Sequence, residues 1–160
     1  MATDAEIALQ NLFDRDALDA GVEGGVRRIL RKTRRYRGGA SDGDIVTAMM
    51  TIRDQIKLYH WQTSLFSRHK ATDELVEKLD ENVDTFVETY MGKYGRPRIS
   101  APIKLSNFSE SAARTFVERQ RKFLSVVLPR KLSPEDTDLL NIRDTILGDL
   151  NQTLYLFTLS

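Results

Sequence analysis

The sequence predicts an all-α protein: a four-helix bundle that follows a short N-terminal helix and a basic arm. Three observations lead to this fold class. Apolar residues recur with the three- and four-residue spacing of one helical face in four long segments, no segment alternates like a β-strand, and Gly, Pro and capping residues separate the segments. With 160 residues, 41% hydrophobic and 29% charged, the chain fits one domain with a single core.

The first forty residues are expected to form the short helix and the arm. Thr3 and Glu6 have the spacing of a capping box, and the helix is expected to end before Gly21. Seven basic residues and no acidic residue follow between two glycine pairs: Arg27, Arg28, Arg31, Lys32, Arg34, Arg35 and Arg37. We therefore expect residues 1–40 to form the helix and basic arm and residues 41–160 to form the bundle.

The first two helices of the bundle are expected to be antiparallel neighbours. One runs from Ser41 to about Trp61, and the other runs from about Leu65 to Met91, where glycines and Pro97 end it. Only a few residues separate the two helices, which is the length of a tight turn.

The last two helices are also expected to be joined by a short loop. The third is expected to begin with Asn107 as N-cap and to end at Pro129, and the fourth to begin with Ser133 as N-cap and Pro134 at its first position. A connection of about fifteen residues precedes the third helix. At ~3.3 Å per residue it can span the ~30 Å length of a bundle, so a long crossover and a simple up-down arrangement both fit.

Composition limits the classes of function. The net charge is +1, so the chain as a whole has no strong attraction to polyanions. The absence of cysteine excludes disulfides, thiolate metal sites and cysteine nucleophiles. No apolar run approaches the ~20 residues of a membrane span, and the N-terminus lacks the pattern of a signal peptide, so we expect a soluble protein that is not secreted and stays inside the cell or particle where it is made.

Candidate metal ligands lie along the second helix. His60 and His69 are the only histidines, and His69, Asp73, Asp84 and Glu88 fall on one stripe at 100° per residue. Asp73 and Asp84 are ~16 Å apart along the axis, so one chain cannot bring both to one metal ion. A second copy of the helix, crossing antiparallel, would bring His69 and Asp73 to Asp84 and Glu88 of the other chain. Two-fold symmetry would then create two equivalent sites.

The residues of this stripe and its surroundings resemble the motif of the Dps-like mini-ferritins: His60-Trp61, Phe66, His69, Asp73, Asp84 and Glu88. Mini-ferritins build a ferroxidase site across a dimer two-fold. The resemblance implies that His60, His69 and Asp73 come from one subunit, that Asp84 and Glu88 come from its partner, and that iron is the metal. The two histidines are about three residues closer together than in mini-ferritins, which implies a shorter turn.

Two longer segments, 60–97 and 141–157, are similar to an uncharacterised ferritin-like family of large DNA viruses. This resemblance covers about residues 42–160. It implies a ferritin-like bundle with a long crossover between the second and third helices. It also implies a homo-oligomer or a partner of capsid-associated proteins, located in the cytoplasm or within a viral particle.

Two functions from different classes follow. The first is an iron-handling ferroxidase, with the basic arm holding it on nucleic acid through non-specific phosphate contacts. The second is a metal-free structural or minor virion protein that uses the bundle as an interaction module, with the arm on nucleic acid or an acidic surface. In the second case the stripe of His69, Asp73, Asp84 and Glu88 is solvated surface. His60 is then packed at the end of its helix, with its imidazole bonded to a backbone carbonyl. Asp144 and Asp149 of the fourth helix are expected at the surface in both cases.

Overall fold

The computed structural model describes residues 40–99 and 102–159 of the chain. Within these ranges all regular secondary structure is helical, which confirms the all-α class, and the helices belong to one compact unit, Gly38–Ser160. The predicted N-terminal helix and the seven cations of the basic arm lie outside the described residues. No helix in the described ranges is both long and apolar enough to cross a membrane.

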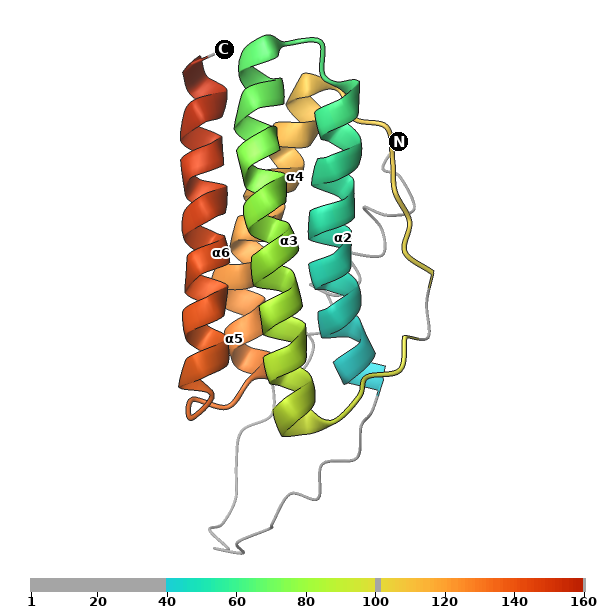
Figure 1. The fold of residues 1–160 in the computed structure, drawn as a ribbon, viewed down its shortest axis with the longest axis vertical. Helices are drawn as coiled ribbons and strands as arrows, with labels where there is room; N and C mark the ends of the chain where they lie inside the picture. The colour runs from blue at the N-terminus through green and yellow to red at the C-terminus, as the bar shows by residue number, and fades with distance from the viewer. Residues whose placement is uncertain (1–39, 100–101, 160) are drawn as a thin grey trace, which may run out of the picture. The chain divides into compact units, whose positions relative to one another are not determined.

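Four helical rods make up the described unit (Figure 1). The first two are α2 (Ala40–Gln62) and α3 (Phe66–Tyr94). The third rod is continuous and consists of α4 (Glu110–Lys122), the π-helical turn η1 (Phe123–Val127) and α5 (Leu128–Lys131). The last is α6 (Thr137–Leu156), extended by the 3₁₀ turn η2 (Phe157–Leu159).

The neighbours of each rod follow from their contacts. α3 packs mainly against α2 and α6, whereas α4 packs mainly against α6 and less against α2, so α3 and α4 occupy diagonal corners. Arg68 near the start of α3 bonds to Glu110 at the start of α4, and Lys93 near the end of α3 bonds to Asp136 just before α6. α3 and α4 therefore run in the same direction, and α2 and α6 run opposite to them (Figure 1).

The described parts of the α3–α4 connection lie beside α2. The carbonyl group of Arg98 lies against Gly43 near the beginning of α2. Further along, Gln55 Nε2 donates to Ser106 O (2.7 Å) and Ser106 N donates to Gln55 Oε1 (2.8 Å). Phe108 N donates to the side chain of Gln62 at the end of α2 (3.3 Å). The described residues at the two sides of the connection thus lie beside opposite ends of α2 (Figure 1).

Most of the apolar residues that recur with helical spacing form the core. On α2 the predicted face is fully buried: Ile45, Met49, Ile52, Ile56 and Tyr59. α3 contributes Leu75, Val76, Leu79, Val83, Phe86 and Tyr90, and α6 contributes Leu139, Ile146, Leu150 and Leu154. Each large aliphatic or aromatic side chain buried here stabilises the fold by about 1.5–3 kcal/mol relative to exposure, which is what holds the four rods together.

Pro129 does not end the third helix, and that prediction was wrong. The chain passes through the π-helical turn, in which Leu128 N donates to Phe123 O, five residues back. The next bond of this kind would need a hydrogen on the nitrogen of Pro129, which proline lacks. Arg143 Nη1 of α6 donates to Leu124 O instead (3.4 Å). The wider turn also relieves the clash that a proline ring makes with the preceding turn of a regular α-helix.

The N-cap of the third helix differs from the prediction as well. Ser109 is the N-cap, because its hydroxyl accepts from Ala112 N (3.3 Å). The predicted cap, Asn107, accepts from Gln62 Nε2 of α2 instead (2.5 Å). Gln62 at the end of a neighbouring helix therefore competes for the side chain of the predicted cap. A local sequence pattern does not reveal this long-range contact.

The fourth helix begins at Thr137, three residues later than the sequence predicted. The carboxylate of Asp136, the N-cap, is buried and accepts from Ser133 N (2.8 Å), Lys93 Nζ (3.1 Å) and the Tyr94 hydroxyl. These bonds hold residues 133–136, which precede the helix, in a turn. Burial raises the pKa of Asp136, but the hydrogen bonds from Tyr94, Ser133 and Lys93 outweigh burial, so the pKa is lowered.

Candidate metal site at the turn between α2 and α3

The two histidine rings stack on each other where α2 meets α3. Their centroids are 4.1 Å apart and the ring planes differ by 23°. His60 Nδ1 lies 3.2 Å from His69 O, and His69 Nδ1 lies 3.1 Å from His60 O. Because a carbonyl oxygen only accepts, each Nδ1 carries a hydrogen, and each neutral ring keeps a lone pair on Nε2. This is the tautomer in which an imidazole binds a metal through Nε2 while a backbone carbonyl orients the ring.

Local structure holds the turn in place. Thr63 N donates to Tyr59 O (2.9 Å), and His69 N donates to Leu65 O (2.9 Å), so the residues between the two helices are tied to both. Thr72 Oγ1 lies 3.2 Å from His60 Nδ1 and donates to the backbone of α3. His60 is buried as a result. Burial and the neighbouring His69 lower the pKa of His60 below its usual 6.5, which keeps the ring neutral at pH 7.

Asp73 completes the local cluster. Its Oδ1 lies 3.7 Å from His60 Nε2, and Lys70 Nζ lies 3.5 Å from its Oδ2. A neutral His60 with its hydrogen on Nδ1 presents a lone pair to a carboxylate oxygen, so both facing atoms are acceptors. Such a pair is satisfied by a hydrogen-bond donor or a cation between the two atoms. The facing His60 and Asp73 atoms could therefore be bridged either by a hydrogen-bond donor such as water or by a cation.

Asp84 and Glu88 are not brought to this cluster. Both are exposed on α3, and Asp84 lies ~16 Å along the helix axis from Asp73. Among the residues that the structure describes, no three His, Asp or Glu side chains are grouped so that they could hold a metal ion. The structure thus places His60 beside His69 and beside Asp73, and leaves Asp84 and Glu88 apart. The assignment of all five as ligands remains a prediction that requires a second chain.

A buried polar network beside the turn was missed at the sequence level. Arg68 is buried, donates to Glu110 O (3.1 Å) and Phe157 O (3.3 Å), and its guanidinium lies 4.1 Å from the centroid of the Phe157 ring. The Glu110 carboxylate accepts from Thr63 Oγ1 (2.7 Å) and the Tyr59 hydroxyl. Burial, with the bond to Glu110, raises the pKa of Tyr59. This network ties the candidate site to the ends of α2, α4 and α6.

A signal for Arg68 was present in the sequence. It precedes Thr72 by four residues and Leu75 by seven, which places it on the same buried face of the helix. A charged residue on an apolar stripe requires a partner when it is buried. The sequence did not show which partner, since Glu110 and Phe157 are far away along the chain.

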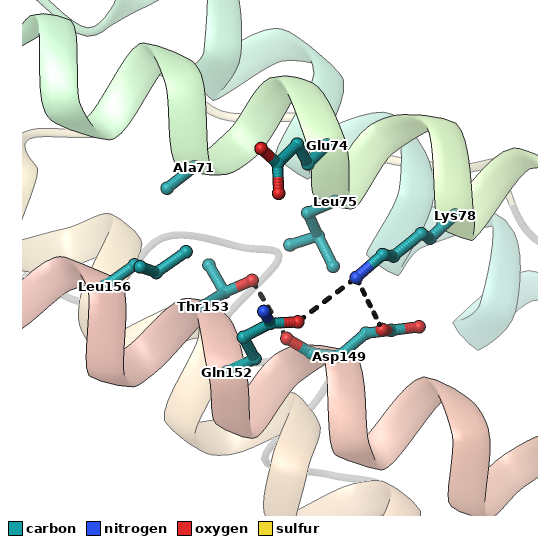
Figure 2. Close-up of a pocket in the computed structure, with 8 residues that line it drawn as sticks. All are labelled: Ala71, Glu74, Leu75, Lys78, Asp149, Gln152, Thr153 and Leu156. Carbon is teal, nitrogen blue, oxygen red and sulfur yellow. Dashed lines mark hydrogen bonds and ion pairs between the residues drawn. The ribbon is translucent and has the colours of Figure 1, made fainter.

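Asp149 departs from the prediction that it is a surface residue. Its side chain is only 14% exposed and lies between α3 and α6, where Lys78 Nζ approaches it to 3.2 Å. Figure 2 shows Lys78 bonded to both Asp149 and Gln152 beside a shallow pocket lined by Ala71, Leu75 and Thr153. Lysine therefore compensates the Asp149 carboxylate. Asp144, with a side chain 59% exposed, is at the surface as predicted.

The turn also carries exposed apolar side chains. Trp61 is 68% exposed, Phe66 is 78% exposed and Leu65 is 39% exposed. Lys57 Nζ lies 5.6 Å from the centroid of the Trp61 ring.

No curated protein and no solved structure matches the chain. Residues 60–157 match a family described as a family of unknown function, DUF5856. The matched segment includes the turn between α2 and α3, all of α3 and the described part of the chain up to Phe157. Because this match covers more than half of the 160 residues, the chain belongs to the family of unknown function DUF5856.

Proposed function

We propose that this protein is a ferritin-like, Dps-like protein that binds Fe(II) at sites shared between two copies of the chain and promotes its oxidation. One observation carries the proposal. Each imidazole of the stacked pair has its Nδ1 bonded to the backbone of the other histidine, which leaves Nε2 of each ring out of these bonds, and His60 Nε2 lies 3.7 Å from Asp73 Oδ1. The metal-free alternative also expects His60 to be packed at the helix end and bonded to a backbone carbonyl. That bond uses Nδ1, so Nε2 is still available to bind a metal ion.

The arrangement of the helices supports the ferritin-like part of the proposal. α2 and α3 are antiparallel, α4 runs parallel to α3, and the connection between them passes along α2 (Figure 1). Two antiparallel pairs joined by one long crossover are the topology of ferritin-like bundles. A simple up-down bundle would place the start of α4 at the opposite end, beside the end of α3.

The shared site follows from symmetry. When two α3 helices cross antiparallel near Asp80, His69 and Asp73 of one copy face Asp84 and Glu88 of the other. Asp80 is exposed, as this crossing requires. Imidazole nitrogen and carboxylate oxygen are suitable ligands for Fe(II), and carboxylates also hold Fe(III). Asp73 and Glu88 would bridge metal ions, with His60 and His69 as terminal ligands.

The reaction that such a site supports needs an oxidant from solution. Two Fe(II) ions each give one electron to hydrogen peroxide, which takes up two protons, breaks its O–O bond and leaves as two water molecules. The protein holds the iron before and after electron transfer. The carboxylates compensate the higher charge of Fe(III), which favours the product.

Anaerobic titration of the full-length chain with Fe(II), followed by addition of peroxide, tests this function. We expect saturable binding and peroxide-dependent formation of Fe(III), both lost in His69→Ala and Asp73→Ala. Asp144→Ala is the matched control, because it removes an exposed carboxylate of α6 that makes no part of the site. Wild-type protein that binds no iron, or an Asp73→Ala variant that binds as wild type does, would contradict the proposal.

A second candidate function is favoured by the exposed aromatic residues. A metal-free interaction module, such as a minor virion protein bound to capsid-associated proteins, would use Trp61 and Phe66 as contacts. In that case Trp61→Ser and Phe66→Ser would abolish partner binding while His69→Ala would not. The metal content of purified protein separates the two candidates.

A further inference from the structure

Five large apolar side chains are exposed at one end of the bundle: Trp61, Leu65, Phe66, Tyr155 and Leu159. The first three belong to the turn between α2 and α3, and the last two belong to the end of α6 and to η2. Arg68 near the start of α3 joins the two groups, because its Nη2 donates to Phe157 O (3.3 Å) and its guanidinium lies 4.1 Å from the centroid of the Phe157 ring. Figure 1 shows the turn and η2 at the same end of the bundle. We call these five side chains the apolar tip.

The segments at this end carry no charged side chain. No Asp, Glu, Lys or Arg occurs in residues 58–67, 107–109 or 150–159, although 29% of the chain is charged. The middle segment belongs to this end because Phe108 N donates to the side chain of Gln62, the last residue of α2 (3.3 Å). The next acidic residue beyond it, Glu110, is partly buried and lies 3.8 Å from the guanidinium of Arg68. An anionic surface that approaches the apolar tip therefore meets no carboxylate of these segments.

Two lysines lie at the rim of the apolar tip. Lys57 is one helical turn before Trp61, and its Nζ lies 5.6 Å from the centroid of the Trp61 ring. Lys70 is one helical turn after Phe66 and is exposed, with Asp73 Oδ2 at 3.5 Å. In the part of the chain that the structure describes, no carboxylate lies within ion-pair distance of Lys57. The rim is therefore cationic where it adjoins the apolar side chains.

We infer that the apolar tip inserts into the surface of an anionic lipid membrane, with Lys57 and Lys70 at the level of the lipid headgroups. Trp and Tyr are typical of the boundary between lipid and water, because each ring is apolar and carries one polar N–H or O–H group. Apolar side chains together with neighbouring lysines are the usual composition of surfaces that lie on membranes. The protein binds the membrane from one side, since no described helix is long and apolar enough to cross it.

The charges favour lipid over a second copy of the chain. Two copies that met tip to tip would bring the rim lysines of one copy towards those of the other, whereas anionic headgroups compensate them. The inference does not depend on the proposed iron chemistry. It gives the apolar tip a lipid surface as its partner, instead of the protein contact of the second candidate function.

Trp61 is the only tryptophan of the chain, so its fluorescence reports directly on the apolar tip. The test uses the full-length, metal-free chain and vesicles of equimolar phosphatidylcholine and phosphatidylserine. We expect the Trp61 emission to shift to shorter wavelength and to be quenched by phospholipids that are brominated on their acyl chains. Flotation of the vesicles measures the affinity. Leu65→Ser/Phe66→Ser should weaken binding by at least about tenfold, because two large side chains no longer leave water.

Ile99→Ser/Val126→Ser is the matched control. It removes two exposed apolar side chains that lie outside the apolar tip, 46% and 38% exposed, and it should bind vesicles as wild type does. Lys57→Gln tests the rim. It should weaken binding to vesicles that contain phosphatidylserine by about fivefold and leave binding to pure phosphatidylcholine unchanged. Circular dichroism of each variant establishes that it is folded.

Three results would overturn the inference. The first is a Trp61 emission that phosphatidylserine vesicles do not change. The second is an equal loss of vesicle binding in Leu65→Ser/Phe66→Ser and in the control, which would show that the position of the apolar side chains does not matter. The third is an emission shift that rises with protein concentration, together with the sedimentation coefficient, and that vesicles do not increase. That result would assign the apolar tip to a second copy of the chain.

Discussion

The carbonyl group of Arg98 lies so close to Gly43 that no Cβ fits at position 43. Gly43 is in the first turns of α2, and Arg98 is in the connection that follows α3. The missing side chain lets the backbone of the connection approach the helix directly. This contact fixes where the connection begins its path along α2.

Gly43→Ala is therefore expected to destabilise the protein by about 1–3 kcal/mol, because the Cβ collides with backbone that cannot rotate away. Alanine is favoured over glycine in a helix by up to about 1 kcal/mol, so the loss occurs despite better helix propensity. Urea unfolding measures the free energy. Gly148→Ala in α6 is the control, since nothing lies near a Cβ there, and it should stabilise by up to about 1 kcal/mol. Equal stability of the two variants would contradict the packing seen at Gly43.

Arg143 and Pro129 are expected to be energetically coupled. Arg143→Met removes the donor to Leu124 O and should cost about 1 kcal/mol of the free energy of unfolding. In the Pro129→Ala background the backbone regains an N–H, so the π-helical turn can close into a regular α-helix and satisfy the carbonyls itself. The cost of Arg143→Met should then fall by at least about half. A double-mutant cycle measures the coupling, and additive free energies would show that Arg143 does not replace the missing donor.

The helices could be predicted because their patterns are local. The apolar spacing of α2 and α3 depends on residues three and four apart, and these apolar residues are buried except for Val87, which is partly exposed. The ends were harder to predict. Asp136 became the N-cap of α6 because Lys93 and Tyr94, more than forty residues earlier, bind its carboxylate. Pro129 is tolerated inside a helix because Arg143 of another helix supplies a donor. Neither relationship exists in a local window of sequence.

The free energy contributed by Asp136 is expected to depend on pH. Its pKa is lowered in the folded state, so its contribution is present above the unfolded-state pKa of about 3.9 and is lost as pH falls through the lower folded-state value. Asp136→Asn should reduce the free energy of unfolding by about 2 kcal/mol at pH 7. The difference from wild type should shrink below about pH 4. Urea unfolding across this range measures it.

Asp138→Asn is the control for Asp136→Asn. Asp138 also binds Lys93 (2.6 Å), but its side chain is 48% exposed, so its removal should have a smaller effect. A destabilisation by Asp136→Asn that stays constant down to about pH 2 would show that the carboxylate charge does not carry the effect.

The candidate site was predictable in part for the same reason. His69 and Asp73 are one helical turn apart, and a short turn places His60 beside them. The ring stacking and the exchange of Nδ1 bonds depend on how tightly that turn closes, which spacing alone does not determine. Thr72, which orients His60, looks like an ordinary helical threonine in the sequence. Whether Asp84 and Glu88 join the site depends on a second chain, which no property of one chain's sequence supplies.

A mixed dimer separates a shared site from two sites within single chains. In the shared arrangement, one site consists of His60, His69 and Asp73 of the first chain with Asp84 and Glu88 of the second, and the other site has the reverse composition. When one chain carries Asp73→Ala and the other carries Glu88→Ala, both losses fall in the same site. The remaining site is built from the two undamaged halves, so the mixed dimer should bind iron at half the wild-type stoichiometry.

The homodimers give the opposite result under the same hypothesis. Each Asp73→Ala chain supplies the damaged half of one site, so both sites of its homodimer are lost, and the same holds for Glu88→Ala. A site contained within one chain cannot include both Asp73 and Glu88, so a site of His60, His69 and Asp73 would survive in the Glu88→Ala homodimer, which would then bind iron as wild type does. Iron titration of mixed dimers purified with two different affinity tags counts the sites directly. Recovery of half the binding on mixing two inactive proteins requires that Asp73 and Glu88 meet across a two-fold axis, whereas no recovery leaves the acidic residues of α3 as solvated surface.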